Sequence, residues 1–239
     1  MNHKTADQLN HINQQFYQTV FDSFDSTRQK PWMGWVQLLS HLWQLPQPLK
    51  VLDVGCGNGR FGSFLAQHIH EIQYTGVDNS ADLLSAARKT FPQGKFQQLD
   101  LMNLDELDKL QQSYDCIVLI AVLHHIPGAT NRIQLLKKLK QKLNKGGFLI
   151  FTAWQFLSIE ALKNRVIPWD KFPEIDQSQL ENNDYLLDWQ RGEHAVRYCH
   201  LIDRNEIDEL ISALSLTKVA QYYADGKENK SNIYVVLQK

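Results

Sequence analysis

Residues 51–60, VLDVGCGNGR, combine an apolar run, an acidic residue and three glycines at alternate positions. Gly55, Gly57 and Gly59 directly follow the run, where a strand is expected to turn into a helix. Glycines at such a turn permit a sharp bend and let the backbone approach a ligand closely. Asp53 comes just before them, and its charge would repel a pyrophosphate but suit a cation. The alternative is an ordinary tight turn between a strand and a helix.

Two further carboxylates have the spacing expected of a nucleoside site. Asp78 ends the next predicted strand, where a carboxylate can accept both ribose hydroxyls, and Asp100 ends the third, where it could meet an adenine amino group. The glycines do not fit the dinucleotide pattern G-x-G-x-x-G, and Arg60-Phe61 stands where a phosphate-binding loop has a lysine followed by serine or threonine. A nucleoside with a positively charged tail fits these features. S-adenosylmethionine (AdoMet) is such a molecule.

The elements that must position these residues follow an alternating pattern. Short apolar runs alternate with amphipathic stretches and predict strands at 50–54, 74–77, 95–98, 116–121 and 148–152. Strands that alternate with helices indicate a parallel sheet in a doubly wound α/β fold. Two last apolar runs, 216–222 and 232–237, flank a turn and predict a closing β-hairpin.

The rest of the chain divides around this core. Residues 1–48 are predicted to be helical, and residues 49–239 to form one domain that includes an insertion at 154–200. Ligands of open parallel sheets lie beyond the carboxyl ends of the strands. Because the insertion leaves one such end, we expect it to form a cap over the acceptor side.

Composition excludes several classes of protein. The 239 residues are 43% hydrophobic and 21% charged, with a formal net charge of -1, which is ordinary for a packed domain and argues against a general binder of polyanions. No apolar run is long enough to cross a membrane, and the polar N-terminus does not resemble a signal peptide. Three scattered cysteines suggest neither a disulfide framework nor a metal site, so we expect a cytoplasmic protein without a metal.

The segments DVGCGNG, YDCIVLIAVLHHI and KGGFLIF, with the aspartates after strands two and three, resemble the class I AdoMet-dependent methyltransferases over about residues 49–153. The resemblance implies a seven-stranded Rossmann-like sheet, mostly parallel with an antiparallel closing hairpin and with helices on both faces. It implies AdoMet as the cofactor and the following cofactor-binding residues: Asp53, Gly55, Gly57, Gly59, Asp78, Asn79, Asp100, Leu101, Ile120 and Ala121.

Flanking segments narrow the resemblance. FDSFDSTRQKPW, IPWD, RYCHLIDRNEIDEL and NIYVVLQK are similar to the tRNA wobble-uridine carboxymethyl methyltransferases, with Cys199 where that family has a tyrosine. The resemblance implies methylation of the carboxylate of a carboxymethyl-uridine. It makes tRNA a candidate partner, together with the small zinc-bearing activator subunit that eukaryotic members use.

A carboxylate acceptor is already ionised at neutral pH and requires contact with a cation rather than a base. Arg197 is the first candidate for this contact and Arg28 the second, because a guanidinium fork matches a carboxylate. The alternative for Arg197 is a structural ion pair with Glu193 or Asp203.

Other candidates for the acceptor side are aromatic or imidazole side chains. His124 and His125 follow the fourth strand and could act as a base or contact the substrate. Trp169, Tyr198 and His200 could also contact the acceptor. Histidines bonded to backbone carbonyls and packed aromatics are the alternatives. In an extended stretch Arg197 and Tyr198 point to opposite faces, so both reach the site only if the chain bends there.

Two other functions fit the same residues. One is a methyltransferase for a small metabolite, with residues 154–200 as a lid. The other is a non-catalytic protein of the same fold that binds a partner, against which the intact glycine turn, Asp78 and Asp100 argue.

Overall fold

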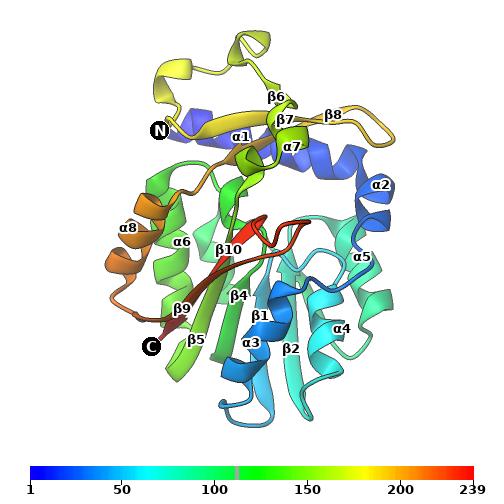
Figure 1. Cartoon of the computed structure of the whole chain (residues 1–239), viewed down its shortest axis with the longest axis vertical. Coiled ribbons are helices and arrows are strands. Elements are labelled where there is room, and N and C mark those ends of the chain that lie inside the picture. Colours follow the sequence, from blue (N-terminus) through cyan, green and yellow to red (C-terminus); the bar gives the residue numbers. More distant parts are fainter. Residues whose placement is uncertain (111–112) are drawn as a thin grey trace.

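The seven-stranded sheet expected from the sequence forms the centre of the molecule (Figure 1). A computed structural model describes residues 1–110 and 113–239. The strand order is β3-β2-β1-β4-β5-β10-β9, and the first five strands run parallel. Their bounds are β1 Leu49–Val54, β2 Ile72–Asp78, β3 Lys95–Gln98, β4 Tyr114–Leu119, β5 Leu143–Trp154, β9 Thr217–Ala224 and β10 Asn232–Gln238.

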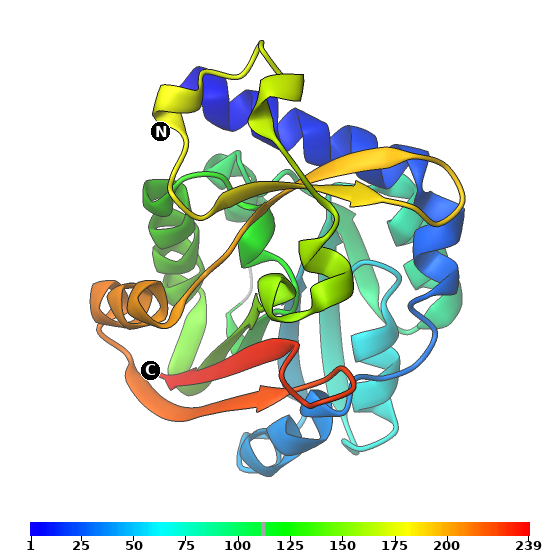
Figure 2. The same cartoon turned by 45° about the horizontal axis from the view of Figure 1, so that its top comes forward.

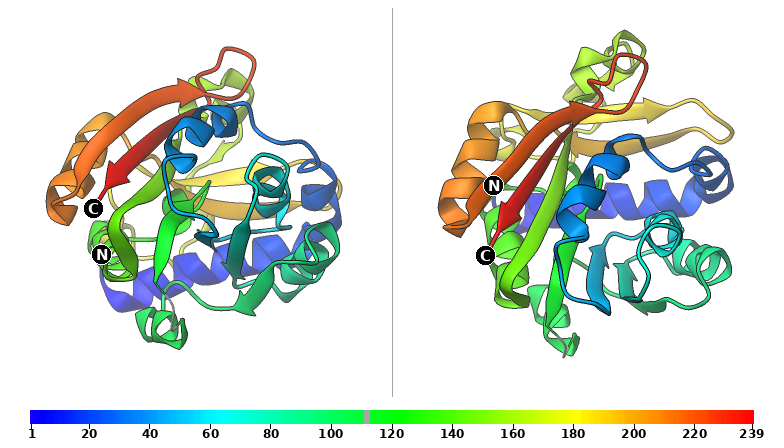
Figure 3. Two further views of the ribbon diagram at one scale, coloured as in Figure 1. Left: turned by 90° about the horizontal axis from the view of Figure 1, so that it is seen from below. Right: turned by 60° about the horizontal axis from the view of Figure 1, so that its bottom comes forward.

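The closing hairpin lies at the edge of the sheet beside β5 (Figure 3). Strand β10 is antiparallel to both of its neighbours, β5 and β9, which confirms the predicted antiparallel end of a mostly parallel sheet. Strand β5 is longer than predicted. It extends to Trp154 because β10 provides a pairing partner, Asn232, opposite that residue.

Helices cover both faces of the sheet, as the doubly wound fold requires. Alternate residues of β4 show the two faces. Cys116 and Val118 pack in the same cluster as α3 (Gly34–Leu42) and α4 (Arg60–Ala66). Ile117 and Leu119 pack with α6 (Ala129–Gln141) and α8 (Arg204–Leu214). Because helices bury both faces of β4, successive residues are apolar on either side, and the strand appears in the sequence as a continuous apolar run.

Local signals determine where two helices begin. Helix α5 (Ala81–Thr90) is capped by Ser80, whose side chain accepts a hydrogen bond from the Leu83 amide. Asp203 caps α8 in the same way through the Glu206 amide. Both starts agree with the sequence, because a side-chain oxygen at the N-cap satisfies an amide that has no partner within the helix.

A second, three-stranded antiparallel sheet was not anticipated within residues 154–200. It consists of β6 (Val166–Ile167), β7 (Asp184–Trp189) and β8 (Ala195–His200). Helix α1 (His3–Thr19) packs against β8, and α2 (Phe21–Ser26) continues from it. The N-terminal helices and the strands within residues 154–200, which are far apart in the sequence, therefore form one layer (Figure 2).

Short helices complete the described chain. They are the 3₁₀ helices Leu104–Lys109, Leu123–His125, Phe156–Ser158, Trp169–Lys171 and Gln177–Gln179, together with α7 at Glu160–Lys163. Among residues 1–110 and 113–239, no helix combines the length and the apolar character needed to cross a bilayer.

Candidate active site

A cavity of about 560 Å³ lies between the carboxyl ends of the sheet strands and the layer formed by α1 and the second sheet. Its volume falls within the range of about 300–1,000 Å³ that is usual for small-molecule sites. The cofactor side is lined by nine of the ten residues predicted to bind AdoMet: Asp53, Gly55, Gly57, Asp78, Asn79, Asp100, Leu101, Ile120 and Ala121.

The glycine turn places backbone at the wall of the cavity. Gly57 has a φ of +53°, and a Cβ built on it would meet no atom within 4 Å. Its amide donates a hydrogen bond of 2.9 Å to Oδ2 of Asp78, which ties the turn to the end of β2. Gly59, the tenth predicted residue, does not line the cavity. It begins α4 and lies against Ala87 of α5, 3.0 Å from where its Cβ would be, so it serves close packing.

Asp78 and Asp53 are buried carboxylates at this wall. Burial raises the pKa of Asp78, although amides from Gly57 and Ser80 that donate to it act in the opposite direction. Burial also raises the pKa of Asp53 to about 7, despite the hydrogen bond it accepts from the Tyr74 hydroxyl. A ligand that brings hydrogen-bond donors or positive charge would stabilise the ionised form of each carboxylate.

Asp100 is bonded from two sides. Its Oδ1 accepts the Met102 amide at 2.9 Å. Its Oδ2 lies 3.4 Å from the Asn10 amide nitrogen and 3.3 Å from that of Gln14, both on α1. These contacts were not anticipated, because nothing in the sequence of α1 marks a residue that reaches a carboxylate 86 positions away.

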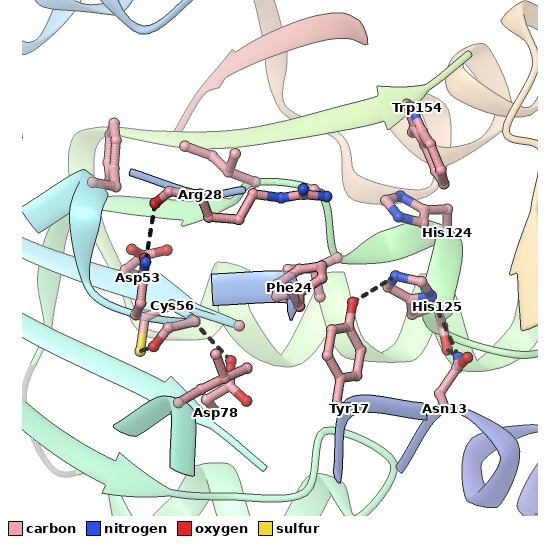
Figure 4. A pocket seen from close by; sticks show the side chains of 18 of the residues that line it. Asn13, Tyr17, Phe24, Arg28, Asp53, Cys56, Asp78, His124, His125 and Trp154 are labelled. Atoms are coloured by element: carbon pink, nitrogen blue, oxygen red, sulfur yellow. Dashed lines mark hydrogen bonds between the residues drawn. The ribbon is translucent and has the colours of Figure 1, made fainter. Parts of the chain in front are cut away.

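On the acceptor side, Arg28 and Arg197 both line the cavity. Figure 4 shows Arg28 extending from the side of Asp53 towards His124. Burial lowers the pKa of Arg28 to about 10, and the positive charge of Arg197 acts in the same direction. Two guanidinium groups give the acceptor side of the cavity a local positive charge.

Arg197 is 5% exposed and has no ion pair with any described residue, Glu193 and Asp203 included. Its Nε has no hydrogen-bond partner either. The structure therefore does not support the alternative that Arg197 forms a structural ion pair. The guanidinium instead lies over aromatic rings, 4.6 Å from the ring centre of Trp154.

The two histidines after β4 differ in their surroundings. His124 is buried and its Nδ1 has no partner. His125 is bonded on both sides, with Nδ1 3.0 Å from the Tyr198 carbonyl oxygen and Nε2 3.0 Å from the Tyr17 hydroxyl (Figure 4). Burial, followed by nearby positive charge, lowers the pKa of both, that of His125 to about 3. Both rings are therefore neutral at physiological pH, and His124 would be a weak base.

Trp169, Tyr198 and His200, three predicted acceptor contacts, do not line the cavity. For Tyr198 and His200 the reason is the two-residue period of β8, which turns Arg197 inward and these two residues outward. Trp169 lies in the short helix Trp169–Lys171, outside β8. The hydroxyl of Tyr198 donates to Asp184 at 2.6 Å. His200 bonds the same carboxylate, and the Trp169 indole nitrogen donates to the Asp184 carbonyl.

His200 belongs to a buried ionic network rather than to the cavity. Arg132, 1% exposed, makes 2.6 Å contacts with both Glu181 and Glu206. His200 lies 2.6 Å from Asp184 and 2.7 Å from Glu206. Glu181, Asp184 and His200 have the composition of a metal site, but the Arg132 guanidinium already provides the positive charge there. The network joins the second sheet to α6 and α8.

Several lining residues escaped the sequence analysis: Asn10, Asn13, Tyr17, Phe24, Trp32, Trp35, Trp154, Arg191, Asp225 and Asn232. Two flanking segments contain some of them: FDSFDSTRQKPW holds Phe24 and Trp32, and NIYVVLQK begins at Asn232. The first segment is tied to the glycine turn. Its Asp25 side chain and Arg28 carbonyl accept hydrogen bonds from Asn58, which fixes this segment on the glycine turn.

Comparisons with known proteins identify the activity. The family described as "Methyltransferase domain" matches residues 52–149. A putative methyltransferase of Encephalitozoon cuniculi is 29% identical over 224 residues, which cover 94% of this chain and 93% of that protein. The chain is an AdoMet-dependent methyltransferase. Its cavity agrees with that cofactor, because the open backbone at Gly57 and the carboxylates of Asp78 and Asp100 face one ligand-sized space.

Further comparisons include a solved structure of the same fold and two other methyltransferases. The AdoMet-bound structure of CalS10, an amino pentose methyltransferase from Micromonospora echinaspora, has a TM-score of 0.61 at 16% identity and covers 92% of this methyltransferase and 97% of its own chain. The tRNA (carboxymethyluridine(34)-5-O)-methyltransferase of Schizosaccharomyces pombe is 24% identical over an alignment that covers 94% of this chain and 95% of that protein. A trans-aconitate 2-methyltransferase of Acidovorax ebreus is 34% identical over 34% of this chain and 30% of its own.

Proposed function

We propose that this methyltransferase methylates a carboxylate, and that the carboxylate belongs to a carboxymethyl-uridine at the wobble position of a tRNA. The observation that carries the proposal is Arg197, a buried guanidinium at the cavity wall whose charge no described carboxylate neutralises. A buried charge of this kind is costly unless a ligand completes it. An anionic acceptor would do so.

The cofactor is proposed to lie along the carboxyl ends of β1, β2 and β4. Asp78 would accept the ribose hydroxyls, Asp100 and Leu101 would meet the adenine, and Asp53 would face the ammonium group. Gly55, Gly57, Asn79, Ile120 and Ala121 would provide the remaining contacts. When bound, AdoMet supplies an electrophilic methyl group on a sulfonium sulfur.

The residues of the acceptor side would orient the carboxylate rather than activate it. A carboxylate is ionised at neutral pH and needs no general base. This agrees with the low basicity of His124, which is neutral and can contribute a hydrogen bond through a ring nitrogen. Arg197 would hold the acceptor, Arg28 would add positive charge, and the layer above would exclude water.

A tRNA acceptor is supported by the Schizosaccharomyces pombe relative, which matches over nearly the whole of both chains. The resemblance in the flanking segments points in the same direction, and two of those segments contribute Arg28 and Arg197 to the cavity. A small-molecule acid is the second candidate. The local similarity to a trans-aconitate 2-methyltransferase favours it, since that protein's name also describes a carboxylic acid acceptor.

The test is methyl transfer from labelled AdoMet to tRNA whose wobble uridine carries a carboxymethyl group but not its methyl ester, compared with transfer to a panel of small carboxylic acids. We expect the label in tRNA, as an ester that mild alkali releases as methanol. Alkali-stable label in tRNA would contradict the carboxylate acceptor. Label in a small acid alone would contradict the tRNA acceptor and leave the carboxylate chemistry in place.

A further inference from the structure

Arg197 is surrounded by aromatic side chains where a buried arginine would ordinarily meet carboxylates. Its guanidinium carbon lies 4.6 Å from the ring centre of Trp154, 5.3 Å from that of Phe16 and 5.7 Å from that of Trp189. We call these three residues the aromatic frame. Among the described residues, no carboxylate comes within ion-pair distance of Arg197.

The aromatic frame is assembled from three distant parts of the chain. Phe16 is on α1, Trp154 ends β5, and Trp189 ends β7. Trp154 lines the cavity, whereas Phe16 and Trp189 stand behind Arg197 and do not line it. The latter two therefore cannot touch a ligand directly, and act through neighbours that line the cavity; Arg197 is the neighbour that lies over both rings.

Trp189 is itself held firmly. Its indole nitrogen donates to the Arg191 carbonyl at 2.6 Å and to the Ser23 hydroxyl at 3.2 Å. Its ring meets Phe16 edge-to-face with centroids 5.7 Å apart, and it is 5% exposed. A ring anchored in this way presents a fixed surface to the guanidinium.

Because aromatic rings and not carboxylates surround Arg197, its positive charge is not neutralised. A carboxylate partner would neutralise the guanidinium and occupy its N–H groups. The face of an aromatic ring attracts a cation but carries no net charge and does not compete for in-plane hydrogen bonds. An arginine held by rings therefore keeps both its charge and its planar fork for a ligand.

We propose that the aromatic frame is a guanidinium-binding site that positions Arg197, with Phe16 and Trp189 as positioning residues for recognition of the acceptor. The role in acceptor recognition rests on the proposed function, whereas the binding of a guanidinium by the frame does not. A side chain shortened at position 197 should therefore leave a vacant site that a free guanidinium ion can enter.

The first experiment measures this binding without any acceptor. Methylguanidinium is titrated by calorimetry into the full-length wild type and the Arg197→Ala variant. We expect roughly millimolar affinity for Arg197→Ala and none for the wild type, whose own side chain fills the frame. Methylammonium, with the same charge but no planar group to lie against the rings, serves as the ligand control and should bind more weakly.

The double variant Arg197→Ala/Trp189→Leu should bind methylguanidinium about five-fold more weakly or worse, since one ring is lost. Arg197→Ala/Trp43→Leu is the matched control. Trp43 is 61% exposed, lies outside the cavity and should leave the affinity unchanged. If the Trp189→Leu double variant does not fold, as judged by circular dichroism, Arg197→Ala/Trp189→Phe replaces it, and weaker binding than in Arg197→Ala is again expected.

The second experiment concerns catalysis. With Arg197 present, Trp189→Leu should raise the KM for the acceptor about ten-fold while the Kd for AdoMet stays the same, and Trp189→Phe should recover part of the loss. Methylguanidinium should restore transfer to Arg197→Ala but not to its Trp189→Leu derivative. Equal binding of methylguanidinium by wild type and Arg197→Ala, or equal binding with and without Trp189, would overturn the proposal. Absence of a carboxylate acceptor would overturn the proposed function instead and leave the binding result standing.

Discussion

The two sides of the cavity are built in different ways. The nine predicted residues that line the cofactor side lie at or shortly after the carboxyl ends of strands β1 to β4, all between positions 53 and 121. The acceptor side combines the two histidines after β4 with side chains from α1, the segment after α2, the end of β5 and β8. Asn13 accepts a hydrogen bond from the Tyr198 amide, 185 residues later. We infer that a local motif suffices for the cofactor side, whereas the acceptor side exists only once the second sheet has docked.

Removal of Arg132 should break the acceptor side most severely, because this arginine holds the second sheet on α6 and α8. Arg132→Leu removes the guanidinium that contacts both Glu181 and Glu206 and leaves His200 as their remaining cationic neighbour. We expect the free energy of unfolding, measured with urea, to fall by about 3–5 kcal/mol. Lys109→Leu removes an exposed ion pair and is the control, for which a far smaller change is expected. A similar loss in both variants would show that the network does not anchor the sheet.

Arg197→Ala should separate the two sides by function. Transfer to the acceptor should fall by about 2–4 kcal/mol in transition-state terms, because the acceptor loses its cationic contact. The Kd for AdoMet should not change, and Arg197→Lys should recover part of the activity, since it keeps the charge but not the fork. These values come from initial rates and calorimetry. A sharp loss of thermal stability with an unchanged rate per folded molecule would make Arg197 a structural residue.

Asp78→Ala should affect the opposite side. It removes the acceptor of the Gly57 amide and the proposed partner of the ribose hydroxyls. We expect AdoMet affinity to fall by about 1–3 kcal/mol in calorimetry. Asp82→Ala, an exposed carboxylate in the first turn of α5, is the control and should bind normally. Unchanged affinity in Asp78→Ala would remove this residue from the cofactor site.

The smallest expected effect is a pH dependence of cofactor binding. Asp53 has a pKa of about 7 in the cavity, so it gains a proton as the pH falls through this value and loses the charge proposed to face the ammonium group. AdoMet affinity should therefore weaken about five-fold from pH 7 to pH 6. Asp53→Asn should bind more weakly at both values and show no such slope. An equal slope in this variant would mean that another group titrates.

The local parts of this molecule could be predicted from its sequence. The strand before Gly55, the caps at Ser80 and Asp203 and the closing hairpin all depend on residues that are neighbours in the chain. Such features follow from backbone conformation and hydrogen bonds within a few residues. Nine of ten predicted cofactor residues line the cavity because parallel pairing of β1 to β4 brings the carboxyl ends of these strands to one edge. Gly59 packs against Ala87 of α5 instead.

The surroundings of Arg197 were decided only by the tertiary structure. The two-residue period of an extended strand predicted that Arg197 and Tyr198 point apart, but not which of them faces the cavity. Docking of the second sheet made that choice, when Tyr198 and His200 joined Asp184 on the opposite face. The rings of Phe16, Trp154 and Trp189 then meet at one guanidinium because packing brings together positions that no sequence spacing relates.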